Sequence, residues 1–227
     1  MEDIDAIAVL QDPVRRRLYE YVVAQGREVG RNEAAEAAGV ARTLAAHHLD
    51  KLTGAGLLES GSRRLTGRSG PGAGRPAKVY TRARTEWSVS LPARDYLTAA
   101  ELLAEAAEGA GLDAGLCAAA RRRGEALRGA GAPCGGLGEA MAVLAARGYE
   151  PHLEGVEGEG DGVRTAVVRM RNCPFHAVAD RFPPLVCGMN LALLEGLLGA
   201  DGPVRARMDA RPGECCVVVE DSKNNID

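Results

Sequence analysis

The chain has 227 residues, of which 46% are hydrophobic and only 4% aromatic, so it can form two small globular domains with mostly aliphatic cores. Its net charge of −3 is uneven: residues 1–90 carry 14 Lys and Arg against 11 Asp and Glu, and residues 91–227 carry 14 against 20, which suits a first part that meets phosphate. No apolar stretch approaches the ~18 residues of a transmembrane helix, and the acidic first five residues do not predict a signal peptide, so we expect a cytoplasmic protein.

Three short helices are predicted in the first 53 residues. Asp12 can cap the first, because Pro13 follows it at the first helical position and apolar residues then recur at helical spacing until Gly26. The second helix covers about residues 32–38 and ends at a glycine, and the third covers about residues 41–53. Two short helices joined by a tight glycine turn form a helix–turn–helix, whose second helix enters the DNA major groove.

The third predicted helix is the candidate reader of base edges. We expect Leu44, Leu49 and Leu52 to face the core and the opposite face to meet DNA. Arg can hydrogen-bond guanine, and the Thr methyl can contact a thymine methyl. The candidate readers on that outer face are Arg42, Thr43 and His47. A small three-helix core with a solvated outer face is the alternative.

A basic hairpin is predicted after these helices. One strand begins near residue 57 and its return covers residues 78–81, with a tip rich in Gly, Ser and Arg. Residues 61–84 include seven basic and no acidic side chains, which repel one another unless a polyanion neutralises them, and each phosphate contact adds salt-dependent affinity. The candidate phosphate-binding residues are Arg63, Arg64, Arg68, Arg75 and Lys78. Double-stranded DNA is therefore the predicted partner.

Four short runs in this region carry a family resemblance: DPVRRRL at residues 12–18, HLDKL at 48–52, AGLL at 55–58 and GRPAKVY at 74–80. Together they resemble bacterial winged-helix repressors of the ArsR/DeoR-like type. The resemblance implies a winged helix–turn–helix DNA-binding domain, which we assign to residues 1–90. It also implies that His48 packs or caps, so His47 is the exposed histidine of the pair.

Two alanine-rich helices are predicted in residues 91–135. The first begins near Tyr96 and the second covers about residues 113–128. An amphipathic stripe must be buried against something, so we expect these helices to join two copies of the chain into a homodimer. Dimeric readers of this kind bind half-sites about 34 Å apart. A helical hairpin packed within one chain is the alternative.

Residues 136–221 predict an α+β sensor domain with an antiparallel sheet, and residues 222–227 a disordered tail. The helices and strands expected there cover residues 137–147, 148–154, 163–170, 183–198, 204–210 and 215–220. The predicted fold class is thus α+β, with an N-terminal winged helix–turn–helix, central dimerisation helices and this C-terminal domain.

Four of the six cysteines lie in the sensor domain: Cys173, Cys187, Cys215 and Cys216. In a reducing compartment they indicate metal chemistry or burial rather than disulfides. The first two lie near helix N-termini, which stabilise the thiolates that soft metals and iron–sulfur clusters require. The last two open a strand, where neighbouring side chains point to opposite faces, so both can reach one group only if the backbone bends. We interpret Cys117 and Cys134 as small hydrophobic residues.

Three motifs surround these cysteines: NCPF at residues 172–175, VCGMN at 186–190 and PGECC at 212–216. They resemble the sensor half of SufR-type repressors of iron–sulfur cluster assembly genes. The resemblance implies a homodimer that holds a [4Fe–4S] or [2Fe–2S] cluster in each subunit through Cys173, Cys187 and Cys215. The third ligand stays open between Cys215 and Cys216, and the fourth between His176, Cys216 and a small molecule.

The predicted function is redox-sensing transcription regulation. With its cluster bound, the dimer would hold a palindromic operator, and loss of the cluster would lift repression. The alternatives are a regulator that senses an apolar metabolite or zinc in its C-terminal domain, and cysteines that are merely buried. The sequence contains no nucleophile–base pair, HExxH, P-loop or G-x-S-x-G motif that would indicate an enzyme.

Overall fold

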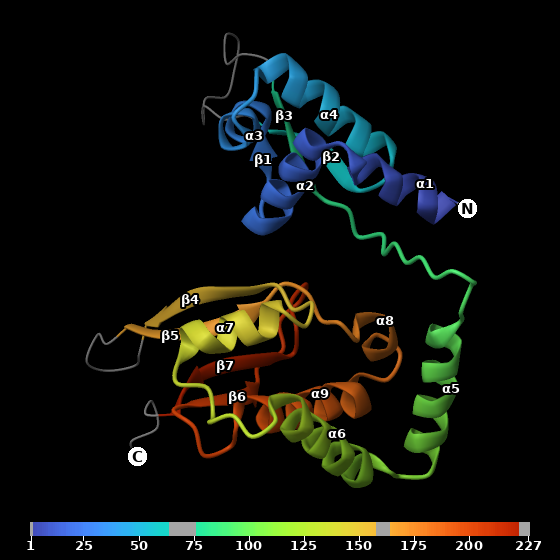
Figure 1. Ribbon diagram of the computed structural model, residues 1–227, viewed down its shortest axis with the longest axis vertical. Helices are drawn as coiled ribbons and strands as arrows, with labels where there is room; N and C mark the ends of the chain where they lie inside the picture. Colours follow the sequence, from blue (N-terminus) through green and yellow to red (C-terminus); the bar gives the residue numbers. More distant parts are fainter. Residues whose placement is uncertain (1, 64–75, 158–163, 223–227) are drawn as a thin grey trace. The chain divides into compact units, whose positions relative to one another are not determined.

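The computed structural model describes residues 2–63, 76–157 and 164–222, and it divides the chain into two compact units, Met1–Arg94 and Asp95–Asp227 (Figure 1). We call these the N-terminal unit and the C-terminal unit. Each has its own hydrophobic core. The predicted tail lies outside the described residues from residue 223 onward.

The N-terminal unit combines short helices with a three-stranded antiparallel sheet in the order β1-β3-β2. Its elements are α1 (Glu2–Ala8), the 3-10 helix η1 (Val9–Gln11), α2 (Pro13–Gln25), β1 (Val29–Gly30), α3 (Arg31–Ala38), α4 (Arg42–Gly54), β2 (Leu58–Arg63) and β3 (Ala77–Arg82). Helices α3 and α4 form the helix–turn–helix, and the β2–β3 hairpin is the wing. The sequence signals missed α1 and the two-residue strand β1.

Local sequence signals explain where these helices begin and end. The Asp12 carboxylate accepts hydrogen bonds from the backbone N–H groups of Val14 (2.9 Å) and Arg15 (3.0 Å), so it caps α2. Gly26 ends α2 and Gly39 ends α3 in the left-handed conformation, with φ of 60° and 65°. The chain therefore turns between helices where the glycines predict it.

The inner face of α4 differs from the prediction at one position. Leu49 and Leu52 are buried as expected, but Leu44 is 42% exposed. Ala45 and His48 take the inner face instead, because positions 45, 48, 49 and 52 form a single stripe at helical spacing. The prediction of Leu44 as a core residue was wrong, and this leucine lies on the outer face with Arg42 and Thr43.

The C-terminal unit contains five helices and a four-stranded antiparallel sheet in the order β4-β5-β7-β6 among the described residues. Its elements are α5 (Tyr96–Gly109), α6 (Asp113–Arg128), α7 (Leu137–Ala145), β4 (Pro151–Glu157), β5 (Arg164–Met170), α8 (His176–Ala179), α9 (Pro183–Leu198), β6 (Val204–Met208) and β7 (Val217–Asp221). The mixed α+β class and the antiparallel sheets agree with the sequence analysis. The last strand begins at residue 217 rather than at the predicted residue 215.

The sheet has one apolar and one charged face. Val168 and Met170 of β5 and Val219 of β7 pack with residues of α7 and α9 in the main core. Because strand side chains alternate, Arg169 and Glu220 point away from that core, yet they are only 1% and 7% exposed. Buried charges need partners, and both of these form ion pairs.

Helices α6 and α9 pack so closely that two glycines are required. A Cβ atom added at Gly124 of α6 would collide with the backbone oxygen of Leu193, and one added at Gly196 of α9 would collide with the backbone oxygen of Arg121. Helix α9 has buried residues around most of its circumference, which is typical of a central helix. Helix α6, one of the two predicted dimerisation helices, is thus packed within its own chain.

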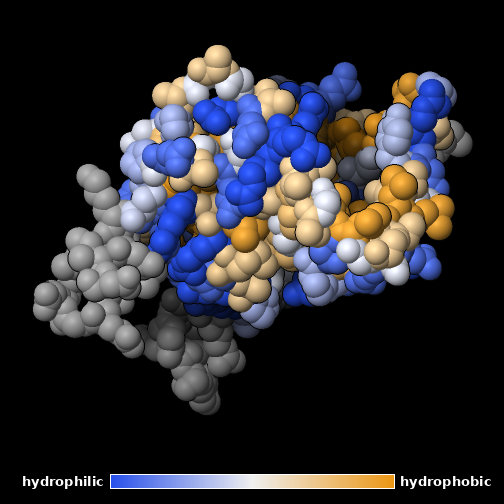
Figure 2. All heavy atoms as spheres, turned by 90° about the horizontal axis from the view of Figure 1, so that it is seen from below, coloured by the Kyte–Doolittle hydropathy of each residue, from blue (hydrophilic) through white to orange (hydrophobic). Residues whose placement is uncertain are grey.

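Helix α5 leaves much of its apolar surface exposed. Ala104 is buried, whereas Tyr96, Leu97, Leu102 and Leu103 are 74%, 49%, 62% and 72% exposed. Figure 2 shows apolar side chains gathered on the side of the molecule where α5 lies. None of the described helices is long and apolar enough to cross a membrane.

Candidate DNA-binding surface and cysteine site

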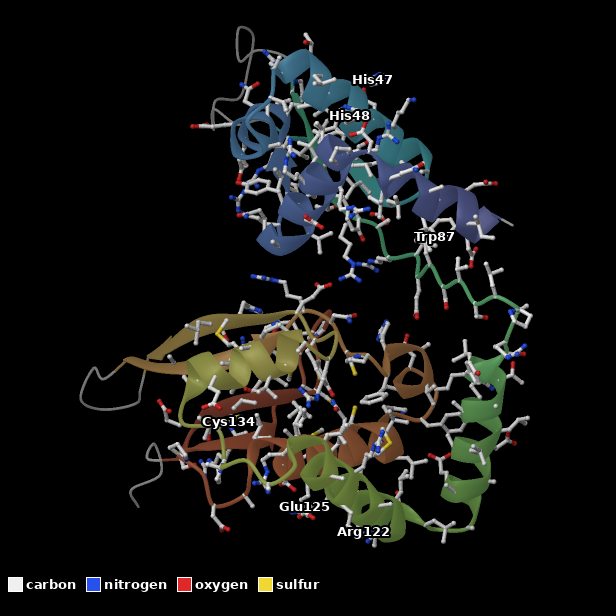
Figure 3. The ribbon with its side chains drawn as sticks, in the orientation of Figure 1. His47, His48, Trp87, Arg122, Glu125 and Cys134 are labelled. Carbon is white, nitrogen blue, oxygen red and sulfur yellow. The ribbon has the colours of Figure 1, made fainter. Side chains whose placement is uncertain are left out.

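The outer face of α4 presents the three predicted base readers. Arg42, Thr43 and His47 are all exposed. His48, next to His47 on α4 (Figure 3), is 6% exposed, and its Nδ1 accepts a hydrogen bond of 3.3 Å from Arg15 Nε. Burial lowers the pKa of His48, so it is a neutral acceptor near pH 7. As the resemblance implied, His48 is structural and His47 is the exposed histidine.

A hollow of about 990 Å³ lies beside this helix, lined by residues of α3, the start of α4 and the wing. Three predicted DNA-binding residues line it, Arg42, Arg63 and Lys78, together with Arg27 and Arg31, which the sequence analysis missed. Two carboxylates, Glu28 and Glu33, also line the hollow, so five cations face two anions and the net positive charge attracts phosphate. Arg31 could have been found from its position at the start of the helix–turn–helix, because the backbone N–H groups at a helix N-terminus also favour anions. Arg64, Arg68 and Arg75 lie outside the described residues.

Several of these cations already have a carboxylate partner. The Asp50 carboxylate on α4 accepts hydrogen bonds from Lys78 Nζ and Tyr80 Oη, both at 2.7 Å, and from Arg31 at 3.2 Å. Burial raises the pKa of Asp50, but the bonds from Lys78 and Tyr80 outweigh it and hold the pKa low. Asp50 therefore ties the candidate reading helix to α3 and to the wing.

Arg42 differs from the other cations of the hollow. Arg63 pairs with Glu28 at 3.3 Å, whereas Arg42 forms no ion pair with any residue in the described part of the chain. Exposed ion pairs contribute only about 0–1 kcal/mol, so a phosphate can displace such a partner at little cost. Arg42 can bind a phosphate or a base without first losing a carboxylate partner, so it is the strongest candidate for a DNA contact in this set.

The second candidate site is formed by cysteines from three separate segments of the C-terminal unit. Cys173 follows β5, Cys187 lies in α9, and Cys215 and Cys216 precede β7. The side chain of Cys215 neighbours those of Cys173 and Cys216, and Cys216 also neighbours Cys187. The structure thus brings together all four cysteines predicted as metal ligands, in a cluster we call the thiol site.

A bend in the backbone explains how adjacent cysteines reach one site. Residue 216 is a bend and β7 begins only at Val217, so Cys215 and Cys216 do not alternate across a strand. The backbone N–H of Cys215 donates to the oxygen of Met170 (2.8 Å), and the oxygen of Cys216 accepts from the N–H of Asp209 (2.8 Å). These bonds fix the bend between β5 and the loop that follows β6.

The thiols influence one another's ionisation. The neighbouring thiols of Cys173 and Cys216 lower the pKa of Cys215, although burial opposes them. The Cys215 sulfur, together with burial, raises the pKa of Cys173 and of Cys216. The cysteines of the thiol site thus shift one another's pKa in opposite directions.

The other predicted ligand is not at the site. His176 is exposed, and its Nδ1 lies 3.4 Å from a carboxylate oxygen of Asp180. Cys134 is buried in the main core, and Cys117 packs where α6 meets Gly188 of α9. Among the described residues, no three His, Cys, Asp or Glu side chains are arranged so as to hold a single metal ion.

A buried polar pair adjoins the thiol site and was missed by the sequence analysis. Asn190 of α9 is fully buried, and its Nδ2 donates to Cys215 Sγ at 3.4 Å. Tyr149, 3% exposed, donates its hydroxyl proton to Asn190 Oδ1 at 2.6 Å. The sequence signal was an asparagine three residues after Cys187, in the part of α9 before Glu195, whose other residues carry no polar side chain.

A buried arginine holds the loop that carries Cys215. Arg169 donates to the carboxylates of Asp209 and Glu154, and also to the backbone oxygen of Asp209 at 3.3 Å. Glu214 lies 3.8 Å from the same guanidinium. Both ends of the loop between β6 and Cys215 are thus tied to one side chain of β5.

Comparison with known proteins identifies the N-terminal unit only. A family described as "Helix-turn-helix domain" matches residues 10–61, less than a quarter of the chain, which includes α2, α3, α4 and part of the wing. Searches of curated proteins and of solved structures found no match. The match supports a DNA-binding transcriptional regulator, and a regulator of this kind is typically not an enzyme.

Proposed function

We propose that this protein is a homodimeric transcriptional repressor whose affinity for a palindromic operator depends on an iron–sulfur cluster held at the thiol site. Its targets would be iron–sulfur cluster assembly genes, as the sequence motifs suggest. The observation that carries the proposal is the convergence of four thiols, from three distant segments, in the unit that does not contain the helix–turn–helix.

The donor set fits such a cluster. Thiolates are the ligands that iron–sulfur clusters use, and the four cysteines of the thiol site can supply them. A cluster distributes its ligands over several irons, so its donors need not surround one point. Cys173, Cys187, Cys215 and Cys216 would hold it.

The chain's own residues explain why the state of this site affects the fold. The thiols lie on the segment after β5, on α9 and on the bend before β7, and a bound cluster supplies covalent links between these segments. Without those links, the three segments are held by hydrogen bonds and packing alone. Any effect on DNA binding is reciprocal, and tenfold derepression needs a coupling free energy of only about 1.4 kcal/mol.

Helix α5 is the candidate dimer contact. Its four exposed apolar side chains, Tyr96, Leu97, Leu102 and Leu103, would be covered by a second copy of the chain. It directly follows the N-terminal unit in the chain, so a dimer joined at α5 would carry two reading heads. Helix α6 is already occupied by α9 and is not part of the proposed contact.

The test is anaerobic purification followed by a visible spectrum, iron and sulfide assays and DNA binding of the loaded and metal-free forms. We expect a coloured protein with stoichiometric iron and sulfide, and different affinities of the two forms for a fragment of its own promoter. A colourless protein that takes up only zinc, or none of these, would overturn the cluster proposal. It would leave the DNA-binding regulator in place.

A further inference from the structure

Asn190 and Tyr149 form a hydrogen-bonded polar pair inside the core, which apolar packing alone does not require. Asn190 is 0% exposed and lies among apolar residues of α9, where an amide without partners is costly. Both of its ends are used: Tyr149 binds the oxygen, and the nitrogen donates to Cys215. A leucine would fill the same space without this requirement, so the position is used for its polarity.

The direction of the two hydrogen bonds is fixed by Tyr149. Burial raises the pKa of Tyr149, so its hydroxyl keeps its proton and donates it to the Asn190 oxygen. The amide NH₂ group is then left facing Cys215. An amide N–H can only donate, and it binds an anionic sulfur more strongly than a neutral thiol.

We propose that Asn190, oriented by Tyr149, is a positioning residue whose hydrogen bond to Cys215 Sγ stabilises this sulfur as a metal ligand. In this way it sets how tightly the thiol site holds a soft metal and, in the iron–sulfur form, the reduction potential. The first effect is independent of the proposed function, and the second rests on it. Hydrogen bonds to ligand sulfurs are one of the factors that tune cluster potentials.

The first experiment measures Cd²⁺ binding to the metal-free, full-length protein by competition with a chelator. Asn190→Leu removes the donor at similar volume, and we expect about tenfold weaker binding, as is usual when a partner of a metal ligand is lost. Tyr149→Phe should weaken binding about threefold, because the amide loses its orientation but not its donors. Tyr19→Phe, in the N-terminal unit, is the matched control and should change nothing.

A double-mutant cycle separates this role from packing. If Tyr149 acts through Asn190, Tyr149→Phe has no further effect on Cd²⁺ affinity in the Asn190→Leu background. The double variant replaces both polar partners with apolar groups, which is nearly neutral for folding, and thermal unfolding checks this. Should the single Asn190→Leu variant fail to fold, the double variant alone must still show the tenfold loss.

The second experiment measures the midpoint potential after reconstitution with iron and sulfide. A hydrogen-bond donor stabilises the more negative, reduced form, so Asn190→Leu should lower the potential. A tenfold change corresponds to about 59 mV for a one-electron couple. Asn190→Leu with wild-type Cd²⁺ affinity, equal effects of Tyr149→Phe in both backgrounds, or a wild type that binds no Cd²⁺ would each overturn the inference. A wild type that binds Cd²⁺ but forms no iron–sulfur chromophore would instead overturn the proposed function.

Discussion

The contact between α6 and α9 gives the sharpest test of the packing in the C-terminal unit. In Gly124→Ala, the new methyl group would meet the backbone of α9, at Leu193 and Leu197, rather than a flexible side chain. The helices must move apart, so the cost of overpacking is at the upper end of about 1–3 kcal/mol. Alanine recovers up to about 1 kcal/mol of helix propensity. The expected net loss is therefore about 2 kcal/mol of unfolding free energy.

A glycine of the same helix supplies the control. Gly115 is exposed, and an added Cβ would have nothing within 4 Å, so Gly115→Ala should stabilise the unit by about 0.4–1 kcal/mol. Calorimetry of the full chain should show the transition of the C-terminal unit about 8 °C lower for Gly124→Ala, at roughly 4 °C per kcal/mol for a unit of this size. It should shift slightly upward for Gly115→Ala. Shifts of the same sign in both variants would refute the reasoning.

Three further predictions concern the two candidate sites and pH. Arg42→Ala should reduce the slope of log K for DNA binding against log salt concentration by about one. Lys78→Ala should reduce this slope by less, because a carboxylate of α4 already neutralises that lysine. Equal slopes for the two variants in filter-binding assays would contradict this. Cys187→Ser should abolish the visible chromophore and Cys117→Ser should preserve it, and normal iron content in the first variant would exclude Cys187 as a ligand. Burial lowers the folded pKa of His48 below about 6.5, so its neutral form contributes stability above that pH that is lost as pH falls through the folded pKa. The free energy of unfolding of the N-terminal unit, measured with denaturant, should therefore decrease on acidification in the wild type. A His48→Asn variant with the same dependence on pH would show that another group is responsible.

Local sequence codes predicted those parts of the fold that local chemistry determines. Asp12 supplies a capping oxygen, and left-handed glycines end α2 and α3. The bounds of α9 follow from a long, mostly apolar run that begins at two prolines and ends before a glycine. The cysteine set could also be named from its motifs. The spacing of the cysteines could not predict that they lie together, because they are up to 43 positions apart in sequence. Their contact depends on how β5, α9 and β7 pack.

The residues that were missed or misassigned all depend on long-range packing. Leu44 was expected in the core because leucines usually are, but Ala45 and His48 fit the narrow space beside α2. The role of Asn190 depends on its contact with Tyr149, which is 41 positions away in the sequence. The bend at Cys216 follows from backbone bonds to Met170 and Asp209, which no pattern of neighbouring residues encodes.

Helix α9 is where the packing of the C-terminal unit and the chemistry of the thiol site meet. It carries Cys187 and Asn190 near one end and the glycine that admits α6 near the other. A close-packed helix does not bend gradually. Binding or loss of a metal at Cys187 is therefore accommodated by rigid-body movement of α9 or of the helices next to it. The neighbour most tightly engaged is α6, and α6 follows α5, the helix with the exposed apolar face, by a three-residue connection. Movement of α9 at the thiol site can therefore be passed through α6 to the proposed dimer contact on α5. Gly124→Ala, which separates α6 from α9, should reduce the difference in DNA affinity between the metal-loaded and metal-free forms, even where both forms still bind DNA.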